Sequence, residues 1–509
     1  MKPELFNSLK NYKRKNILND LLAGLMVAII ALPLSIALGI QSVPAGMGNG
    51  IQAGIITAIV AGFFISLLGG SRFQIGGPTA AFVVILFGYL SNPDIGILGL
   101  AIAGIMAGVL LILMGLLRVG NVMKFFPYPI TIGFTTGIGI TLLIGQIKDL
   151  CGFESSGTEA IEKIASYIEN IQTFDPATFL VGALGLLCVI VIPKINKKIP
   201  SAFVALILCT VVTQLLNNFA GTSIKTIGSS YGEIEAGFNL IDFSMISNVK
   251  IPSLIVPAIV IAFLCAIESL LSATVASGMT GTSFDANQEL IGQGVANICS
   301  SLVGGLPATG AIARTAAGIE NGSKSPLTGV FHAIFLLIMY FALMSVVGFI
   351  PLAVFSAILI SVAINMSRFK LFCKLSAFGI RDSIILIVTC ALTIIFDLTY
   401  GVIGGIVITL LANIGSFRRG LSLEVDGTSI KAKGSINFVN VNKILKACAS
   451  MSEEKEITID FTSVERIDET ALEKLASLNR SMNKEERTLL LINFSQRVQN
   501  RYDRFFKVV

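Results

Sequence analysis

Fourteen apolar segments dominate this 509-residue chain, and they fall into two sets of seven. The segments lie near residues 21–40, 51–70, 78–90, 95–117, 126–147, 176–193 and 200–216, and then near residues 252–272, 288–304, 308–319, 328–348, 351–366, 380–396 and 400–416. The third segment of each set is too short to cross a hydrocarbon core of about 30 Å, which requires about 20 helical residues. A half-helix is tolerated at membrane depth only where its free backbone groups are buried in protein or line a cavity. Because seven is an odd number, the second set enters the membrane in the inverted orientation, as in inverted-repeat transporters.

The composition agrees with an α-helical membrane protein that has many spans. Hydrophobic residues make up 54% of the chain and charged residues 13%, with a mean hydropathy of +0.82, whereas soluble domains carry about 25% charged residues. The polar, basic N-terminus and the absence of a convincing cleavage site argue against a cleaved signal peptide. The predicted domains are an N-terminal cytoplasmic segment (1–20), a transport domain (21–420) with repeats at about 21–216 and 252–416, and a soluble C-terminal domain (421–509).

The basic residues predict the orientation of the spans. If the N-terminus is inside, the inner loops and ends contain Lys2, Lys10, Lys13, Arg14, Lys15, Arg72, Arg118, Lys124, Lys194, Lys197, Lys198, Lys324, Arg368, Lys370, Lys374, Arg381, Arg418 and Arg419. The outer loops then contain only Lys148, Lys163, Lys225 and Lys250. This distribution obeys the positive-inside rule, and an even number of spans places both termini in the cytoplasm.

Two apolar segments are interrupted by glycine and proline in corresponding halves. Residues 68–81 read Leu-Gly-Gly-Ser-Arg-Phe-Gln-Ile-Gly-Gly-Pro-Thr-Ala-Ala, and residues 304–315 read Gly-Gly-Leu-Pro-Ala-Thr-Gly-Ala-Ile-Ala-Arg-Thr. The N-terminal N–H groups of an interrupted helix carry partial positive charge and attract anions. The insertion of an arginine such as Arg314 at bilayer depth has a free-energy cost of about 2.5–3.5 kcal/mol, so the residue requires a compensating role or partner. Paired interruptions of this kind predict a transporter's substrate site, here for an anion.

Residues 421–509 have the pattern of a small soluble α/β domain. Segments 421–425 and 429–436 predict a hairpin around Asp426-Gly427, and a helix is expected from about 441 to 451. Residues 457–461 alternate as a half-buried strand, and residues 489–494 have the pattern of a buried strand. Between them, residues 470–482 carry Ala471, Leu472, Leu475 and Leu478 at helical spacing.

The order of these motifs resembles the SulP anion transporters, the sulfate permease family. The motifs run from residues 20–25 (Asp-Leu-Leu-Ala-Gly-Leu) and 32–35 (Leu-Pro-Leu-Ser) through both interrupted segments and residues 268–272 (Glu-Ser-Leu-Leu-Ser). The C-terminal domain resembles a STAS domain, with residues 459–461 and 467–472 at its core. The resemblance implies a seven-plus-seven inverted repeat with a core domain that moves against a gate domain, and a homodimer. It also implies a substrate held between the facing N-termini of the short third and tenth helices.

Arg314 aligns with the basic residue that family members place beside the anion. A guanidinium group can bind an oxyanion with two hydrogen bonds; the alternative is a structural ion pair, for instance with Glu268. The other predicted substrate contacts are the backbone groups of Thr79, Ala80, Ala81, Gly310, Ala311, Ile312 and Ala313, the hydroxyl groups of Thr79 and Thr309, and the first-helix residues Leu34, Leu38 and Gln41. Gln41 is either a polar contact in the pocket or a residue facing a loop.

Glu268 is the strongest candidate for ion coupling, with Ser272 one helical turn further on. Burial favours the neutral form of a carboxyl group, so Glu268 can bind and release a proton; alternatively, it is a structural carboxyl group between the third and tenth helices. Bicarbonate-transporting members of the family place a threonine, hydroxyl groups and a carboxylate around sodium. Here Gly310 and Ala311 match, but Ile312 stands where that threonine would be, and hard cations require oxygen ligands. We therefore favour proton symport over sodium coupling, and an uncoupled exchanger remains open.

The remaining sequence features predict no further functional site. Thr470 matches the phosphoacceptor position of bacterial STAS relatives, but its neighbours depart from their motif, so we predict a helix N-cap. The single histidine, His332, and eight cysteines without metal-binding spacing predict no metal site. We expect no enzyme activity, cofactor or nucleic-acid partner. An anion channel or voltage-responsive motor and a nucleobase permease of similar fold are the competing functions. Sulfate, bicarbonate and C4-dicarboxylates all suit the predicted anion site.

Overall fold

The computed structural model describes the chain except for short stretches. The residues outside the description are 1, 11, 45, 124–126, 155–159, 197–198, 233–235, 239, 242–243, 245–248, 368, 373–378, 397, 418–419, 439, 452–453, 485–486, 497, 500–501 and 503–509. Seven of the basic residues used to predict the orientation therefore lie outside the described residues, namely Lys124, Lys197, Lys198, Arg368, Lys374, Arg418 and Arg419.

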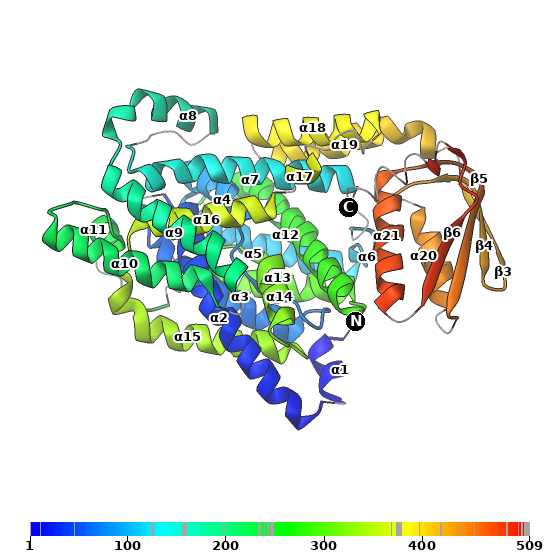
Figure 1. Cartoon of the computed structure of the whole chain (residues 1–509), viewed down its shortest axis with the longest axis horizontal. Coiled ribbons are helices and arrows are strands. Elements are labelled where there is room, and N and C mark those ends of the chain that lie inside the picture. Colours follow the sequence, from blue (N-terminus) through cyan, green and yellow to red (C-terminus); the bar gives the residue numbers. More distant parts are fainter. Residues whose placement is uncertain are drawn as a thin grey trace. The chain divides into compact units, whose positions relative to one another are not determined.

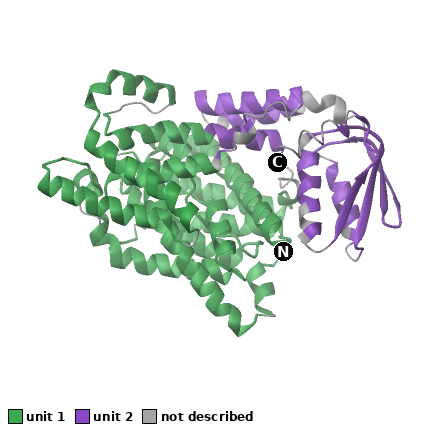
Figure 2. Cartoon of the chain, viewed as in Figure 1, with its two compact units in different colours: residues 1–124, 138–365 green, residues 125–137, 366–509 purple. Residues whose placement is uncertain are grey.

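The chain forms two compact units, shown in Figure 2. Unit 1 comprises residues 1–124 and 138–365, and unit 2 comprises residues 125–137 and 366–509. Each unit is described by itself. The helix α7 (Tyr128–Cys151) contributes its first residues to unit 2 and the rest to unit 1.

The helices of unit 1 account for the predicted spans of the first repeat and most of the second. They are α1 (Glu4–Lys10), α2 (Arg14–Ser42), α3 (Gly50–Leu68), α4 (Ala80–Ser91), α5 (Gly96–Leu116), α6 (Gly120–Met123), α7, α8 (Ala160–Glu169), α9 (Pro176–Ile195), α10 (Ser201–Phe219), α11 (Ile227–Tyr231), α12 (Ile251–Thr280), α13 (Ala286–Leu302), α14 (Ile312–Glu320), α15 (Leu327–Val347) and α16 (Leu352–Met366). A short 3-10 turn, Ile171–Thr173, precedes α9.

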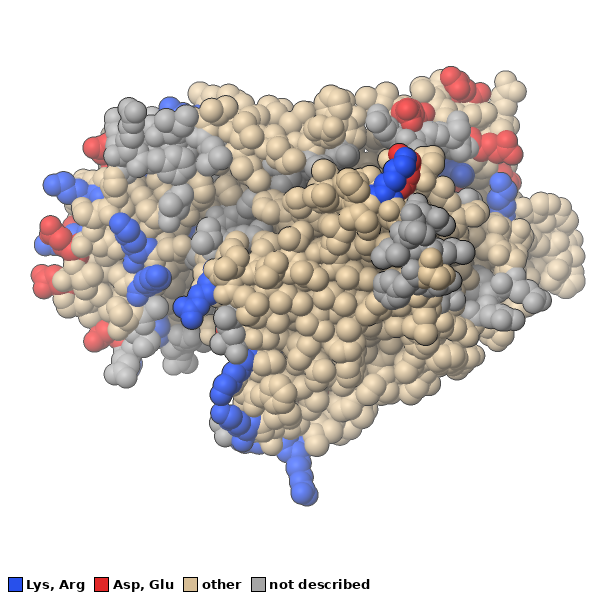
Figure 3. Space-filling model, turned by 180° about the vertical axis from the view of Figure 1, so that it is seen from behind, with Lys and Arg blue, Asp and Glu red and all other residues tan. Residues whose placement is uncertain are grey.

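All fourteen predicted segments correspond to helices, so the predicted fold class is confirmed. In the described residues, eight helices are long and apolar enough to cross a membrane: α2, α3, α5, α7, α9, α10, α12 and α15. The third and tenth predicted segments are the short helices α4 and α14, with 12 and 9 residues. At 1.5 Å per residue neither can span the hydrocarbon core. Over the middle of the face in Figure 3, the described residues carry no Lys, Arg, Asp or Glu, as a lipid-facing surface requires.

The N-terminal end of α2 is fixed by a buried carboxylate. Asp20 is fully buried, and its Oδ1 accepts hydrogen bonds from the N–H groups of Lys324 and Ser325, at 2.6 and 3.1 Å, and from Thr328 Oγ1 at 2.7 Å. The hydroxyl group of Tyr12 donates to Asp20 Oδ2. Because the bonded backbone groups lie just before α15, one side chain ties the first helix of repeat 1 to a helix of repeat 2.

Unit 2 contains the last two predicted spans and the C-terminal domain. The two spans are α18 (Ile380–Ile395) and α19 (Leu398–Phe417), and the four-residue helix α17 (Phe369–Phe372) precedes them. The C-terminal domain contains β3 (Leu421–Asp426), β4 (Ser429–Ile436), α20 (Val441–Ser450), β5 (Glu456–Ile467), α21 (Glu469–Lys484) and β6 (Thr488–Ile492). The sheet order is β3-β4-β5-β6, with an antiparallel β3–β4 hairpin and parallel β4–β5 and β5–β6 pairs. Both helices lie on one face of the sheet (Figure 1).

The predicted alternation in this domain is confirmed. Ile457, Ile459 and Phe461 of β5 are fully buried, and Leu472 and Leu475 of α21 are buried in the same cluster. Parallel strands require a crossover, and α20 and α21 supply the two connections. The domain is therefore a small α/β layer with its core between the sheet and the two helices.

The predicted N-cap role of Thr470 is wrong. The helix α21 begins at Glu469, and Asp468 Oδ1 accepts the N–H of Ala471 at 2.7 Å, so Asp468 is the residue that caps the helix. Thr470 lies in the first turn and is buried, with an exposed fraction of 3%. Its Oγ1 accepts a hydrogen bond of 3.0 Å from the backbone N–H of Tyr128, the first residue of α7. Thr470 thus supplies the hydrogen-bond acceptor for the first backbone N–H of α7, within unit 2.

Candidate functional site

The two interrupted segments meet in a two-stranded sheet inside unit 1. The strands β1 (Gly76–Gly77) and β2 (Thr309–Gly310) pair antiparallel, with Gly76 opposite Gly310. The pairing continues as the N–H of Ala311 donates to Ile75 O at 2.9 Å. The half-helix α4 begins three residues after β1, and α14 begins two residues after β2. The sheet therefore brings the N-termini of both half-helices to one place.

Neither half-helix is capped by its own preceding side chain. The N-cap residues are Thr79 for α4 and Ala311 for α14, and neither makes a side-chain cap hydrogen bond. The first N–H groups of a helix have no partner within the helix. Together with the helix dipole, such N–H groups attract negative charge. The predicted backbone contacts at residues 79–81 and 310–313 thus lie at two uncapped helix starts. The N–H of Ala311 is not free to bind an anion, because it donates to Ile75 O.

Arg314 is buried beneath the paired strands. Its exposed fraction is 2%, and its Nη1 donates to Gly76 O while its Nη2 donates to Ser35 Oγ, both at 3.1 Å. Gly77 has a positive φ of 150°, and a Cβ there would overlap the guanidinium group, so glycine is required for this approach. Among the described residues, Arg314 forms no ion pair, and the ion pair with Glu268 considered from the sequence does not occur.

Glu268 lies against the start of α4. It is half-buried on α12, and its Oε2 accepts a hydrogen bond of 3.0 Å from Thr79 Oγ1. The hydroxyl group of Thr79 is thereby directed to the carboxylate instead of capping its own helix. Ser272 does not join this pair, because its buried Oγ lies 3.5 Å from Thr315 Oγ1. The carboxylate is therefore adjacent to one of the two helix N-termini.

The structure places the other predicted contacts as follows. The Oγ1 of Thr309 donates to Cys265 O at 3.0 Å, so this hydroxyl group is committed to α12. Ile312 is exposed to 37%, and Ala313 is exposed beside it at the start of α14. Leu34 and Leu38 are buried in α2, and Gln41 at the end of the same helix donates to Asp149 Oδ2 at 3.1 Å.

A polar stripe on α13 holds both interrupted segments, and sequence reasoning missed it. Fully buried Glu289 accepts hydrogen bonds from the N–H groups of Gly70 and Ser71, at 2.9 and 3.1 Å, and from Ser269 Oγ and Gln293 Nε2. One turn beyond Gln293, Asn297 bonds both the N–H and the C=O of Ala308, at 2.8 and 2.9 Å. The i, i+4 spacing of 289, 293 and 297 was the available signal, since it aligns three polar side chains on one helix face.

His332 and the cysteines supply no described metal site. His332 is fully buried, and neither ring nitrogen has a hydrogen-bond partner among the described residues. No group of three or more His, Cys, Asp or Glu side chains suited to a metal occurs in the described part of the chain.

Ser35, whose Oγ accepts a hydrogen bond from Arg314, is a site residue that the sequence analysis missed. It belongs to the motif at residues 32–35, but no role was assigned to it.

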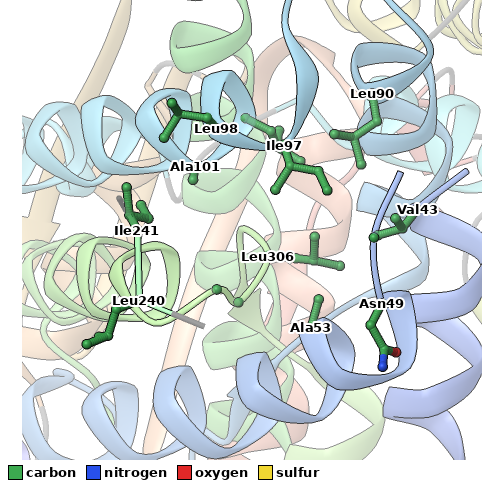
Figure 4. Close-up of a pocket in the computed structure, with 14 residues that line it drawn as sticks. Val43, Asn49, Ala53, Leu90, Ile97, Leu98, Ala101, Leu240, Ile241 and Leu306 are labelled. Carbon is green, nitrogen blue, oxygen red and sulfur yellow. The ribbon is translucent and has the colours of Figure 1, made fainter. Parts of the chain in front are cut away.

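A separate cavity of about 330 Å³ has an apolar lining (Figure 4). Its walls include Val43, Leu90, Ile97, Leu240 and Leu306, and none of the predicted site residues belongs to them. Its polar side chain Asn49 accepts the N–H of Gln52 at the start of α3. Such a lining does not suit an anion, so the paired half-helices remain the candidate site.

Comparisons with known proteins match both the membrane part and the C-terminal part of the chain. The sequence profile described as Sulfate permease family matches residues 17–389, and the STAS domain profile matches residues 423–505. The chain is 40% identical over 417 residues to the putative sulfate transporter YvdB of Bacillus subtilis, which covers 81% of this chain and 75% of that protein. It is 31% identical over 422 residues to the bicarbonate transporter BicA of Picosynechococcus, with 81% and 72% covered.

Two solved structures share the fold. The transmembrane domain of a cyanobacterial bicarbonate transporter BicA superimposes with a TM-score of 0.69 at 28% identity, covering 78% of this chain and 98% of that one. The structure of SLC26A9 gives a TM-score of 0.70 at 18% identity, covering 98% of this chain and 88% of that one. The second comparison includes the C-terminal domain as well as the membrane helices.

Proposed function

The chain belongs to the sulfate permease family, and we propose that it is a secondary active transporter that carries a small anion together with a proton. The observation that carries this proposal is the buried guanidinium group of Arg314, which has no ion-pair partner among the described residues and lies beside two uncapped helix starts. A buried charge without a counter-charge is costly. An anion bound between the helix starts would offset that cost.

Arg314 would act on the anion mainly through its charge. Two of its N–H groups are used by Gly76 O and Ser35 Oγ, so the side chain is fixed in the wall of the site. The exposed start of α14 at Ile312 and Ala313, and the start of α4 at Ala80 and Ala81, would supply the direct N–H contacts. This arrangement suits a small oxyanion, whose charge interacts with donors on two sides.

Glu268 would couple the proton to the anion. An ionised carboxylate next to the start of α4 competes with an anion for the same positive potential and repels it. Protonation of Glu268 removes that repulsion, so the binding of the proton and the anion becomes mutually favourable. The hydrogen bond from Thr79 connects the carboxylate to the helix start where the anion would sit.

Sodium coupling is the alternative coupling mode. It would require oxygen ligands near Glu268, and the side chain of Ile312 supplies none at the position where the family resemblance implies a threonine. An uncoupled exchanger would use the same anion site without titration of Glu268. Both alternatives predict that a proton gradient does not drive uptake.

Sulfate and bicarbonate are the substrates named for the relatives, and either fits the proposed site, as does a C4-dicarboxylate. We further propose that the half-helices move with the helices that hold them, in an elevator-like alternating-access cycle within a homodimer, with both termini in the cytoplasm. The hydrogen bonds from α13 to both interrupted segments support movement of the site as one rigid body.

The decisive experiment is uptake by purified protein in liposomes. Labelled sulfate, bicarbonate and dicarboxylates would be offered under imposed proton or sodium gradients. Saturable uptake of one anion, accelerated by an inward proton gradient, is the expected result. Uptake that requires sodium at constant pH would replace the proton by sodium, and currents without saturable flux would favour a channel or motor.

A further inference from the structure

An amphipathic helix lies between the fifth and sixth predicted spans, in a stretch that the sequence assigns to an outer loop. This helix, α8, carries isoleucines at spacings of three and four residues, which places them on one helix face. The pattern continues into the 3-10 turn that follows. The four side chains have exposed fractions between 42% and 70%, and we call them the outer isoleucine stripe: Ile161, Ile164, Ile168 and Ile171.

A different face of α8 is docked on its neighbours. Tyr167 is buried, and its hydroxyl group donates to Ile144 O of α7 at 2.9 Å. Ala160 is buried as well, and Lys163 Nζ lies 5.2 Å from the ring centroid of Phe87 on α4, a cation–π distance. These contacts fix the rotation of α8 about its axis, so the outer isoleucine stripe stays exposed beside the docked face.

The docking position lies beside α7 and not beyond its end. Ile144 precedes Cys151, the last residue of α7, by about two helical turns, which correspond to about 10 Å. The N–H of Asp175, the N-cap residue of α9, donates to Cys151 O at 3.0 Å. The ends of the two spans therefore meet, and α8 folds back beside the last turns of α7 (Figure 1).

The exposed surface of α9 continues the stripe. The helix α9 is long and apolar enough to cross a membrane, and its Leu180 and Leu187, two turns apart, are exposed by 65% and 59%, as a lipid-facing surface requires. The ring centroids of Phe179 and Phe174, both exposed, lie 5.7 Å apart. Phe174 closes the 3-10 turn that begins at Ile171. The apolar surface of α9 thus extends through two aromatic rings to α8.

The charges of this segment argue against attachment to anionic lipid. Along α8, the two carboxylates Glu162 and Glu169 stand against one lysine, Lys163, and Glu154 and Asp175 flank the helix. Attraction to an anionic surface requires an excess of basic residues. The burial of apolar area has to supply the favourable free energy instead.

We propose that the outer isoleucine stripe inserts into the outer leaflet of the bilayer, so that α8 is an interfacial anchor for the ends of α7 and α9. The partner is the phospholipid itself, at the boundary between headgroups and acyl chains. An amphipathic helix of this kind buries its apolar face about 5–10 Å into that boundary. The choice of the outer leaflet rests on the orientation in the proposed function, whereas the contact with lipid does not.

The first test uses the absence of tryptophan from the chain, because a single introduced tryptophan reports only its own surroundings. Full-length Ile168→Trp would be placed in phosphatidylcholine liposomes, with or without bromine on the upper part of the acyl chains. We expect brominated lipid to quench its fluorescence as strongly as that of Leu180→Trp on α9. Glu169→Trp is the matched control, since Glu169 is exposed but lies outside the stripe. Acrylamide in the water should quench this control, and brominated lipid should not.

Two results would overturn the lipid contact. Quenching of Ile168→Trp by acrylamide and not by brominated lipid would place the stripe in water. Protection from both quenchers would mean that protein covers the stripe, for instance a second copy of the chain. Quenching by lipid only when anionic lipid is added would contradict the apolar basis of the attachment.

The second test concerns anchoring. The triple variant with Ile161→Ser, Ile164→Ser and Ile168→Ser should exchange the backbone amide hydrogens of α8 faster than wild type in liposomes, because the helix is released from the lipid. Glu169→Ser should exchange at the wild-type rate. Equal exchange in the triple variant and wild type would mean that docking on α7 alone holds α8, and would overturn the anchor.

The third test separates the leaflet from the lipid contact. In intact cells, Glu169→Cys should react with a membrane-impermeant maleimide above the wild-type background. Lipid quenching without this reaction would place the stripe in the inner leaflet and contradict the orientation in the proposed function. Lipid quenching in protein that takes up no anion would support the anchor and contradict the proposed transport alone.

Discussion

Thr79 and Glu268, 189 residues apart in the chain, are joined by a hydrogen bond of 3.0 Å between Oγ1 and Oε2. The bond links α12 to the N-cap residue of the half-helix α4. Any change in the protonation of Glu268 is therefore felt where the anion is proposed to bind. The first prediction follows from this pair.

Glu268→Gln should abolish the stimulation of uptake by an inward proton gradient and keep the fold. Glutamine can still accept the hydrogen bond of Thr79, but it cannot gain or lose a proton in this range. Anion exchange across liposomes at equal pH should persist, because the neutral side chain resembles the protonated carboxyl group. The check is uptake with and without a pH gradient, with exposed Glu320→Gln as the control. A gradient response that survives in Glu268→Gln would contradict proton coupling through this residue.

Arg314→Ala should weaken anion binding or transport by about ten- to a hundredfold. The loss of one charge-assisted interaction costs about 1.5–3 kcal/mol, and each 1.4 kcal/mol is a factor of ten in affinity. Arg314→Lys should recover part of the effect, since the charge returns but the two bonds to Gly76 and Ser35 cannot both form with the same geometry. Binding would be measured by titration of the purified variants.

Arg72→Ala is the control for Arg314, because the described contacts of the Arg72 side chain are a hydrogen bond to Lys324 O and the Phe73 ring, so its loss should mainly affect expression or insertion. If folded Arg314→Ala binds the anion as tightly as wild type, Arg314 is structural and the helix starts alone hold the substrate.

Glu289→Ala should strongly lower the thermal stability of unit 1. The change leaves the N–H groups of Gly70 and Ser71 and the side chains of Ser269 and Gln293 without their shared acceptor. Each buried polar group left unpaired costs about 1–3 kcal/mol. The apparent melting temperature in detergent should fall well below that of Glu289→Gln, which retains an acceptor oxygen. Equal melting temperatures for Glu289→Ala and wild type would show that the network does not stabilise the site.

Thr470→Val should destabilise unit 2 without changing the order of preferred anions. The substitution keeps the shape of the side chain but removes the acceptor for the Tyr128 N–H, at a cost of about 1–3 kcal/mol. We expect a lower melting temperature or a changed transport rate, measured together with competition by a panel of anions. The exposed Thr488→Val should leave both unchanged. A new selectivity order in Thr470→Val would mean that the C-terminal domain shapes the anion site.

The elements of the fold could be predicted from the sequence because their determinants are local. The length of an apolar segment decides whether a helix can span the membrane, so the fourteen segments and the shortness of α4 and α14 were readable directly. Alternation of apolar residues likewise predicted β5, and Asp426-Gly427 predicted the hairpin of β3 and β4. The motifs that carry the family resemblance were also short stretches in a fixed order, so they could be recognised without the tertiary structure.

The partner of each polar side chain was decided only by the tertiary structure. Arg314 bonds Gly76 and Ser35 instead of Glu268, Thr470 bonds Tyr128 instead of capping α21, and Glu289 anchors a loop more than 200 residues away. Several partners were available to each of these groups, and their sequence distances carry no information about which one lies within hydrogen-bonding distance. The choice follows from how the helices pack, and packing depends on the shape of the whole core and not on any single segment.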